Sequence, residues 1–94
     1  MYHVIAYYKF YSIAAPEGFC AEQKELCRSL TLKGRIYIAQ EGVNGTAAGT
    51  AENIEKYKKH LCSLPGFENI EFKTNQHTVI PFDRLIVKTR PEIV

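Results

Sequence analysis

The sequence predicts an α+β fold in which two helices cover one face of an antiparallel sheet. Three observations predict it: the length of 94 residues, an unexceptional composition, and a β-α-β-β-α-β succession of periodic segments. A chain of this length forms one domain, since domains typically hold about 100–150 residues. Hydrophobic residues make up 46% of the chain and charged residues 23%, which is ordinary for a globular protein and argues against disorder.

The first half of the chain alternates strand and helix patterns. Residues 3–11 are rich in aromatic and β-branched types, which favours a strand. Pro16 suits the first turn of a helix, and the apolar positions that follow share a face at helical spacing until Gly34, a plausible stop. A second strand is expected over residues 35–40, where isoleucines alternate with polar residues.

The second half repeats this alternation. Residues 46–49 are expected to form a short strand, and Thr50 caps a second helix that ends at Pro65-Gly66. Residues 70–73 could add a short extra strand, and residues 84–90 form the last one. With two right-handed crossovers, this order predicts a ferredoxin-like sandwich with both helices on one side. In that fold the last strand lies beside the first.

A glycine-rich motif, Glu41-Gly42-Val43-Asn44-Gly45-Thr46, separates the second and third predicted strands. Asn44-Gly45 is a strong turn signal, because both residues tolerate positive φ. We therefore expect a loop containing Glu41, Gly42, Asn44, Gly45 and Thr46, with Gly45 at positive φ. Backbone N–H groups in such a loop can bind a phosphate. The alternative is a plain hairpin turn, which the residues alone favour because Asn-Gly hairpins are common.

Charge and cysteine content restrict the function further. The net charge is only +2, and bases outnumber acids from Lys73 onward, which by default indicates a solvated strand face. Cys20, Cys27 and Cys62 are odd in number and form no CxxC pair, so we expect small core residues rather than disulfides or ligands. The three histidines lie on different predicted elements. The sequence thus predicts no metal site and no cofactor.

The chain shows no feature of a membrane or secreted protein. No apolar run approaches the roughly 18 residues that span a bilayer, and the start lacks a signal-peptide pattern. A cytoplasmic location is therefore expected. The apolar pair Ile93-Val94 at the end of the chain suggests that a longer polypeptide continues beyond it.

Three stretches carry a resemblance to a known family. Residues 39–49 resemble the EGVNGT signature of the rhodanese-domain proteins described as tRNA wobble-uridine hydroxylases. Residues 81–94 and the run Tyr7-Tyr8-Lys9-Phe10-Tyr11 also fit that family. The resemblance covers nearly the whole chain but only the family's N-terminal domain. It implies an acylphosphatase-like version of the ferredoxin-like fold for residues 1–94, and a downstream rhodanese domain with a reactive cysteine loop.

The resemblance also implies tRNA as a partner. The parent protein would then be an oxygen-dependent tRNA uridine hydroxylase, with this domain as an accessory module that positions RNA. If the first and last strands adjoin, the uncovered sheet face carries an aromatic and basic set: Tyr7, Lys9, Tyr11, Arg84, Lys88 and Arg90. Aromatic rings stack on bases, and cations neutralise phosphates. The alternative is a structural role, in which this face docks on the rhodanese domain of a sulfurtransferase.

Catalysis by these 94 residues alone is not expected. Acylphosphatases, which this family resembles in fold, use a Gly-rich phosphate loop with an arginine after the first strand. Residues 11–16 contain neither glycine nor arginine, which disfavours an acylphosphatase-like hydrolase. No cysteine lies in a Gly/Arg-rich loop that could replace the rhodanese nucleophile. We therefore predict no catalytic residue here and assign turnover, as an oxidoreductase, to the parent protein.

Overall fold

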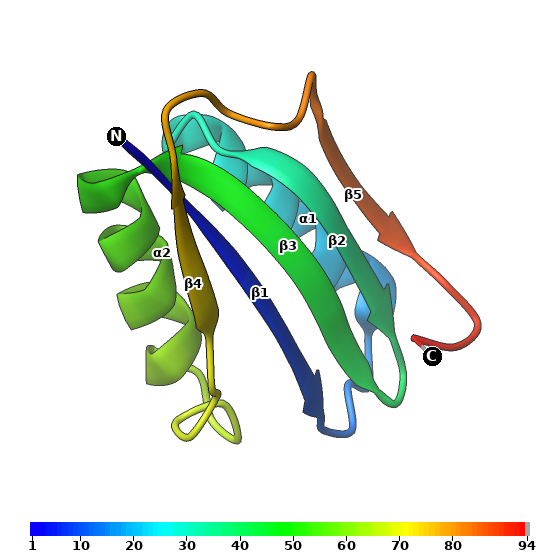
Figure 1. Cartoon of the computed structure of the whole chain (residues 1–94). Helices are drawn as coiled ribbons and strands as arrows, with labels where there is room; N and C mark the ends of the chain where they lie inside the picture. Colours follow the sequence, from blue (N-terminus) through cyan, green and yellow to red (C-terminus); the bar gives the residue numbers. More distant parts are fainter. Residues whose placement is uncertain (94) are drawn as a thin grey trace.

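The computed structural model describes residues 1–93 and shows a five-stranded mixed sheet with two helices against one face (Figure 1). This confirms the predicted α+β, ferredoxin-like class. Val94, which belonged to the family-like stretch and the apolar end, lies outside the described residues. The elements are β1 (Tyr2–Phe10), α1 (Pro16–Ser29), β2 (Lys33–Ala39), β3 (Gly42–Thr50), α2 (Ala51–Ser63), β4 (Lys73–His77) and β5 (Leu85–Thr89).

The strand order is β4-β1-β3-β2-β5, and all neighbours are antiparallel except β5, which runs parallel to β2. The expectation that residues 84–90 lie beside the first strand is wrong, because β4 occupies that place and β5 forms the opposite edge. Strand β4 has the sequence Lys-Thr-Asn-Gln-His, and all five residues are exposed. An edge strand without a buried face needs no apolar alternation, so its sequence pattern gave no signal.

The core lies between the sheet and the helices. Helix α1 packs on β2 and β5, and α2 packs on β1 and β3. Ile5, Ile36, Ile54 and Leu61 are fully buried in this layer. Burying an aliphatic side chain of this size stabilises a fold by about 1.5–3 kcal/mol. The predicted cap of α2 is confirmed, since the hydroxyl of Thr50 accepts a hydrogen bond of 3.2 Å from the backbone N–H of Asn53.

The predicted loop over residues 41–46 is wrong, because β3 already begins at Gly42. The turn falls at residues 40–41, and Gly42 has the positive φ of 153°. Gly45 lies inside β3 and is not among the positive-φ residues of the described chain. It is needed for another reason: a Cβ there would lie 2.8 Å from the hydroxyl oxygen of Tyr7. The Asn-Gly pair thus reflects close packing rather than a turn.

Candidate nucleic-acid interface

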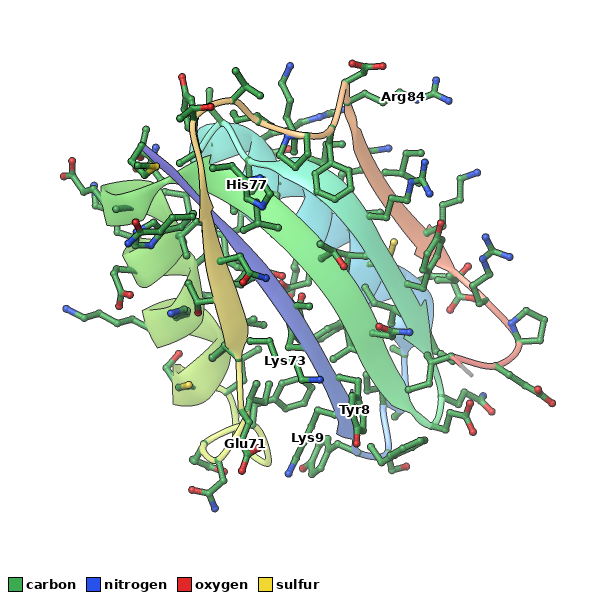
Figure 2. All side chains as sticks on the ribbon, in the orientation of Figure 1. Tyr8, Lys9, Glu71, Lys73, His77 and Arg84 are labelled. Carbon is green, nitrogen blue, oxygen red and sulfur yellow. The ribbon has the colours of Figure 1, made fainter. Side chains whose placement is uncertain are left out.

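The sheet face opposite the helices, here termed the open face, is covered by no helix (Figure 2). Side chains alternate along each strand. Ile5 and Tyr7 of β1 point into the core, so Tyr8 and Phe10 lie on the open face, where they are 67% and 55% exposed. On β2, Ile36 is likewise buried. The residues on either side of it therefore belong to the open face.

One row across the open face carries two tyrosines. The strand register aligns Tyr8, Asn44, Tyr37 and Lys88 on β1, β3, β2 and β5. Because neighbouring strands are about 4.8 Å apart, the backbones at Tyr8 and Tyr37 are separated by roughly 10 Å. The guanidinium of Arg90 lies 4.4 Å from the centroid of the Tyr37 ring, a cation–π contact. The row therefore combines two rings with two cations.

Further basic residues surround this row. The next row runs Lys73, Ala6, Thr46, Arg35 and Ile86. The cations of the open face are Lys33, Arg35, Lys73, Lys88 and Arg90. Within residues 1–93, every aspartate and glutamate lies outside the five strands. The open face consequently has a positive potential, although the chain as a whole is nearly neutral.

Half of the predicted RNA-binding set does not lie on the open face. Tyr7 is 4% exposed, and its hydroxyl shares a hydrogen bond of 2.5 Å with that of Tyr57 on α2. Lys9 follows Tyr7 on the helix side of β1, and Tyr11 packs edge-on against Phe67 with centroids 5.5 Å apart. The prediction placed Tyr7, Lys9 and Tyr11 on the uncovered face, whereas Tyr8 and Phe10 are the β1 side chains that lie there. Tyr7 is therefore unable to stack on a base.

The other three predicted residues cluster with different partners from those expected. Lys88 and Arg90 lie on the open face beside Tyr37, while β3 and β2 separate them from β1. Arg84 precedes β5 at the far end of the sheet (Figure 2). The sequence reasoning missed Tyr8, Tyr37, Arg35, Lys33 and Lys73. The buried isoleucines of β2 were the signal that could have placed Arg35 and Tyr37 on the open face.

The EGVNGT motif holds the end of the described chain. The carboxylate of Glu41 accepts a hydrogen bond of 2.8 Å from the backbone N–H of Ile93. The side-chain amide of Asn44 donates one of 3.2 Å to the carbonyl of Ile93. Strand β3 is paired on both sides, so its backbone N–H groups belong to the sheet. The motif is therefore a clamp on Ile93, and the phosphate-binding loop considered from the sequence does not exist.

Within residues 1–93 the interior offers no activated nucleophile. Cys27 is fully buried, and burial raises the pKa of its thiol to about 12. Burial also raises the pKa of Tyr57 well above its usual range. A thiol with such a high pKa is almost wholly protonated near neutrality and reacts slowly. No group of three or more His, Cys, Asp or Glu side chains in residues 1–93 is placed to hold a metal ion.

Comparisons with known proteins agree with the fold. Residues 2–93 match the family described as UPF0176 acylphosphatase like domain. Over 93 residues, 99% of this chain, the sequence is 45% identical to proteins named tRNA uridine(34) hydroxylase from Bacillus cereus (strain G9842) and Bacillus anthracis. The chain spans 29% of the length of these curated relatives. None of the helices within residues 1–93 has the length and hydropathy needed to cross a bilayer.

Two groups of solved structures share the fold. The dark-state structure of BlrB, a BLUF protein, has a TM-score of 0.74 and 16% identity, covering 93% of this chain and 72% of that one. An acylphosphatase from Coxiella burnetii has a TM-score of 0.58 and 13% identity, covering 95% of this chain and 90% of that one. At such low identity these likenesses establish the architecture alone.

Proposed function

The chain belongs to the UPF0176 acylphosphatase-like domain family, and we propose that its open face contacts the RNA substrate of a longer, tRNA-hydroxylating protein. The relatives' name supplies the substrate class, tRNA. One observation supports an RNA-contacting role for this domain: a single row across the sheet joins Tyr8 to Tyr37, and Arg90 lies over the Tyr37 ring. Lysines flank this row, and the strands of the described chain contain no acidic residue.

This arrangement suits single-stranded RNA. Unpaired bases stack on exposed aromatic rings and on guanidinium planes, and each such stack contributes about 1–3 kcal/mol. Tyr8 offers an exposed ring, and Arg90 offers a guanidinium that lies over the ring of Tyr37. Their separation of roughly 10 Å suits two splayed bases rather than two adjacent bases in a continuous stack.

The charge distribution also orients the domain. The helices carry the acidic residues Glu17, Glu22, Glu25, Glu52 and Glu55. The helices carry equally many lysines and arginines, so their net charge is zero, whereas the strands carry bases alone. An RNA backbone is therefore attracted more strongly to the open face than to the helical side, so encounter favours one orientation. Because the described interior lacks an activated nucleophile, we place the hydroxylation chemistry outside this chain.

Docking on the rest of the protein is a second candidate for the end of the open face near Phe10. Ile93 is 7% exposed and lines a small apolar pocket with Tyr8 and Phe10, which pair edge-to-face at 5.9 Å. A polypeptide leaving from Ile93 begins next to these rings. The RNA proposal uses the row from Tyr8 to Tyr37, so the two candidates overlap at the ring of Tyr8 and differ at Tyr37 and β5.

The test compares the salt dependence of tRNA binding for two double variants. Lys88→Ala with Arg90→Ala removes two cations from the open face, and Lys24→Ala with Lys59→Ala removes two exposed cations from the helices. We expect the first pair to weaken binding and reduce the log–log salt slope by about 1–2, because fewer counterions are released. The helix pair should leave the slope nearly unchanged.

Equal slopes for the two double variants would contradict the proposal. A lower melting temperature of the longer protein with Lys88→Ala and Arg90→Ala, together with an unchanged slope, would instead favour docking on a following domain. Exposed charges contribute little to stability. The domain itself should therefore keep its melting temperature in either case.

A further inference from the structure

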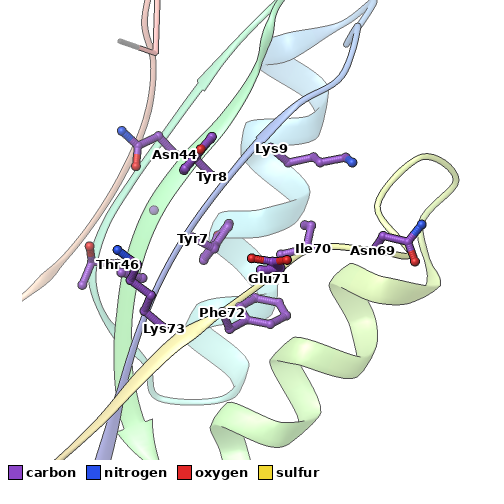
Figure 3. A pocket seen from close by; sticks show the side chains of 12 residues that line it. Tyr7, Tyr8, Lys9, Asn44, Thr46, Asn69, Ile70, Glu71, Phe72 and Lys73 are labelled. Atoms are coloured by element: carbon purple, nitrogen blue, oxygen red, sulfur yellow. The ribbon is translucent and has the colours of Figure 1, made fainter.

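The sheet has a notch along one edge of β1. Strand β4 pairs with β1 only from Tyr2 to Ala6, and the chain before Lys73 turns away from the sheet. The last residues of β1 therefore have no strand on that side within the described chain. Between them and residues 69–72 lies an open space of about 540 Å³ (Figure 3). Ligand sites for small molecules typically measure about 300–1,000 Å³.

The notch has an apolar floor and a polar rim. Its floor contains the rings of Tyr7 and Phe72, which pack edge-to-face at 5.5 Å, and the buried Ile70. Its rim carries one exposed ring, two cations and several hydrogen-bonding groups: Tyr8, Lys9, Lys73, Glu71, Asn44 and Asn69. In Figure 3 these side chains come from β1, from β3, from the segment that leads into β4 and, for Lys73, from the start of β4.

We infer that this notch is a subsite for one unstacked RNA nucleotide, with its base against Tyr8, its base edge at Glu71 and its phosphate at Lys73. The inference rests on the proposed function and specifies part of the ligand. The exposed ring of Tyr8 matches the planar face of a base. The ammonium group of Lys73 matches a phosphate, which needs charge but no fixed geometry.

Glu71 selects the kind of base. A carboxylate only accepts hydrogen bonds, so it favours a base edge with an N–H donor, such as the imino group of uracil or guanine. It disfavours the corresponding ring nitrogen of adenine, which is an acceptor. A free anion without a base would meet this negative charge with no compensating donor. The combination of Glu71 with Lys73 therefore points to a nucleotide rather than to phosphate alone.

The position of the notch agrees with a path along the open face. Tyr8 belongs both to the notch and to the row that leads through Asn44 to Tyr37. Lys73 belongs both to the notch and to the row of Arg35. A strand of RNA that stacks one base over Arg90 and Tyr37 can thus place a nearby nucleotide in the notch without leaving the positive surface.

The experiment is a titration of the isotope-labelled chain with uridine monophosphate, followed by amide chemical shifts. We expect shifts at residues 6–9 and 69–73. Glu71→Ala should weaken binding about tenfold, as for the loss of a hydrogen bond to a charged group. Glu71→Gln should fall between, because its amide oxygen still accepts. Glu25→Ala, which removes an exposed carboxylate from α1, is the matched control and should bind like wild type.

Several results would overturn the subsite. Equal shifts with inorganic phosphate would mean an anion site only, and equal affinity for adenosine monophosphate would exclude the role of Glu71. Shifts of the same amides that depend on protein concentration alone would mean that a second copy adds a strand to the β1 edge. Uridine monophosphate could bind as expected while Lys88→Ala with Arg90→Ala leaves the salt slope of tRNA binding unchanged. In that case the proposed function fails and the subsite stands. If the salt slope changes as expected but uridine monophosphate does not bind in the notch, the subsite fails and the proposed function stands.

Discussion

The carboxylate of Glu41 accepts a hydrogen bond of 2.8 Å from the backbone N–H of Ile93, 52 residues further along the chain. Asn44 completes the contact by donating to the carbonyl of the same residue. The backbone N–H and the backbone carbonyl of Ile93 are thereby both hydrogen-bonded to side chains of the EGVNGT motif. The motif thus determines where the described chain leaves the sheet, beside Tyr8 and Phe10.

The first prediction tests this clamp. Glu41→Ala removes the acceptor for Ile93, so the backbone amide of Ile93 should exchange with solvent about tenfold faster, as for the loss of a hydrogen bond of about 1–1.5 kcal/mol. Native-state hydrogen exchange measures this directly. Glu92→Ala removes an exposed neighbouring carboxylate and should leave the exchange rate unchanged. Unaltered protection of Ile93 in Glu41→Ala would show that the clamp has no energetic role.

The second prediction concerns the packing of Gly45 against Tyr7. In Gly45→Ala the new Cβ would lie 2.8 Å from the Tyr7 hydroxyl oxygen and 3.1 Å from Cγ1 of Ile36. Overpacking of this kind costs about 1–3 kcal/mol. Gly18→Ala is the control, since a Cβ there meets nothing within 4 Å, and removing a helical glycine should stabilise by about 0.5–1 kcal/mol. Chemical unfolding gives both values.

A double variant shows whether the hydroxyl is the obstacle. Tyr7→Phe alone should cost about 1 kcal/mol or more, because it leaves the Tyr57 hydroxyl without its buried partner. Adding Tyr7→Phe to Gly45→Ala removes the contact with the hydroxyl oxygen but keeps the ring carbon Cζ, which lies 2.9 Å from the new Cβ. The double variant should therefore be somewhat more stable than the sum of the single effects predicts. Simple additivity would mean that the ring carbon, rather than the hydroxyl, is the obstacle.

The third prediction concerns thiol reactivity. Cys27 is 0% exposed, whereas Cys20 and Cys62 are half-buried. Burial raises the pKa of Cys20 as well, though less than that of Cys27. With a thiol reagent under native conditions, Cys62 should react first, Cys20 more slowly and Cys27 only on unfolding. Peptide mapping over time gives the order. Labelling of Cys27 at the rate of Cys62 would contradict its place in the core.

The sequence could predict the elements that have a buried face. The first strand, the helix that begins at Pro16 and the Thr50 cap all follow from local chemistry and agree with the structure within a few residues. Strand β4, Lys73–His77, was expected only as a short extra strand over residues 70–73, because an exposed edge strand carries no apolar pattern. The Asn44-Gly45 pair misled because the close approach of Tyr7, which lies opposite Gly45 on the neighbouring strand β1, demands the glycine.

The candidate site could be predicted only in part. Lys88 and Arg90 were identified, but their strand was expected beside β1, whereas it pairs with β2. The sequence did not show that β4 takes the place beside β1. The sequence did not determine which side chains of β1 face the helices, since adjacent tyrosines at positions 7 and 8 place an aromatic ring on each face. Pairing with the buried hydroxyl of Tyr57, on a helix 50 residues away, decides which tyrosine turns inward.

The last prediction concerns stability at high pH. Burial raises the pKa of Cys27 from 9.0 to about 12 in the folded chain, while the unfolded chain keeps the ordinary value. Between these two values the unfolded state binds fewer protons than the folded state. The stabilising contribution is therefore complete below about pH 9 and is lost as the pH rises toward 12, at about 1.4 kcal/mol per unit for one fully titrating group.

Urea unfolding of wild type and Cys27→Ala at several pH values isolates this group. The variant should be less stable near neutrality, because it leaves a small cavity. Its free energy of unfolding should nevertheless fall less steeply than that of wild type from about pH 9 to about pH 11, since one of the linked protons is gone. Tyr7 and Tyr57, whose pKa values burial also raises, titrate in both proteins and cancel in the comparison to first order. Parallel curves would show that the Cys27 thiol titrates alike in the folded and unfolded chains, which a fully buried side chain forbids.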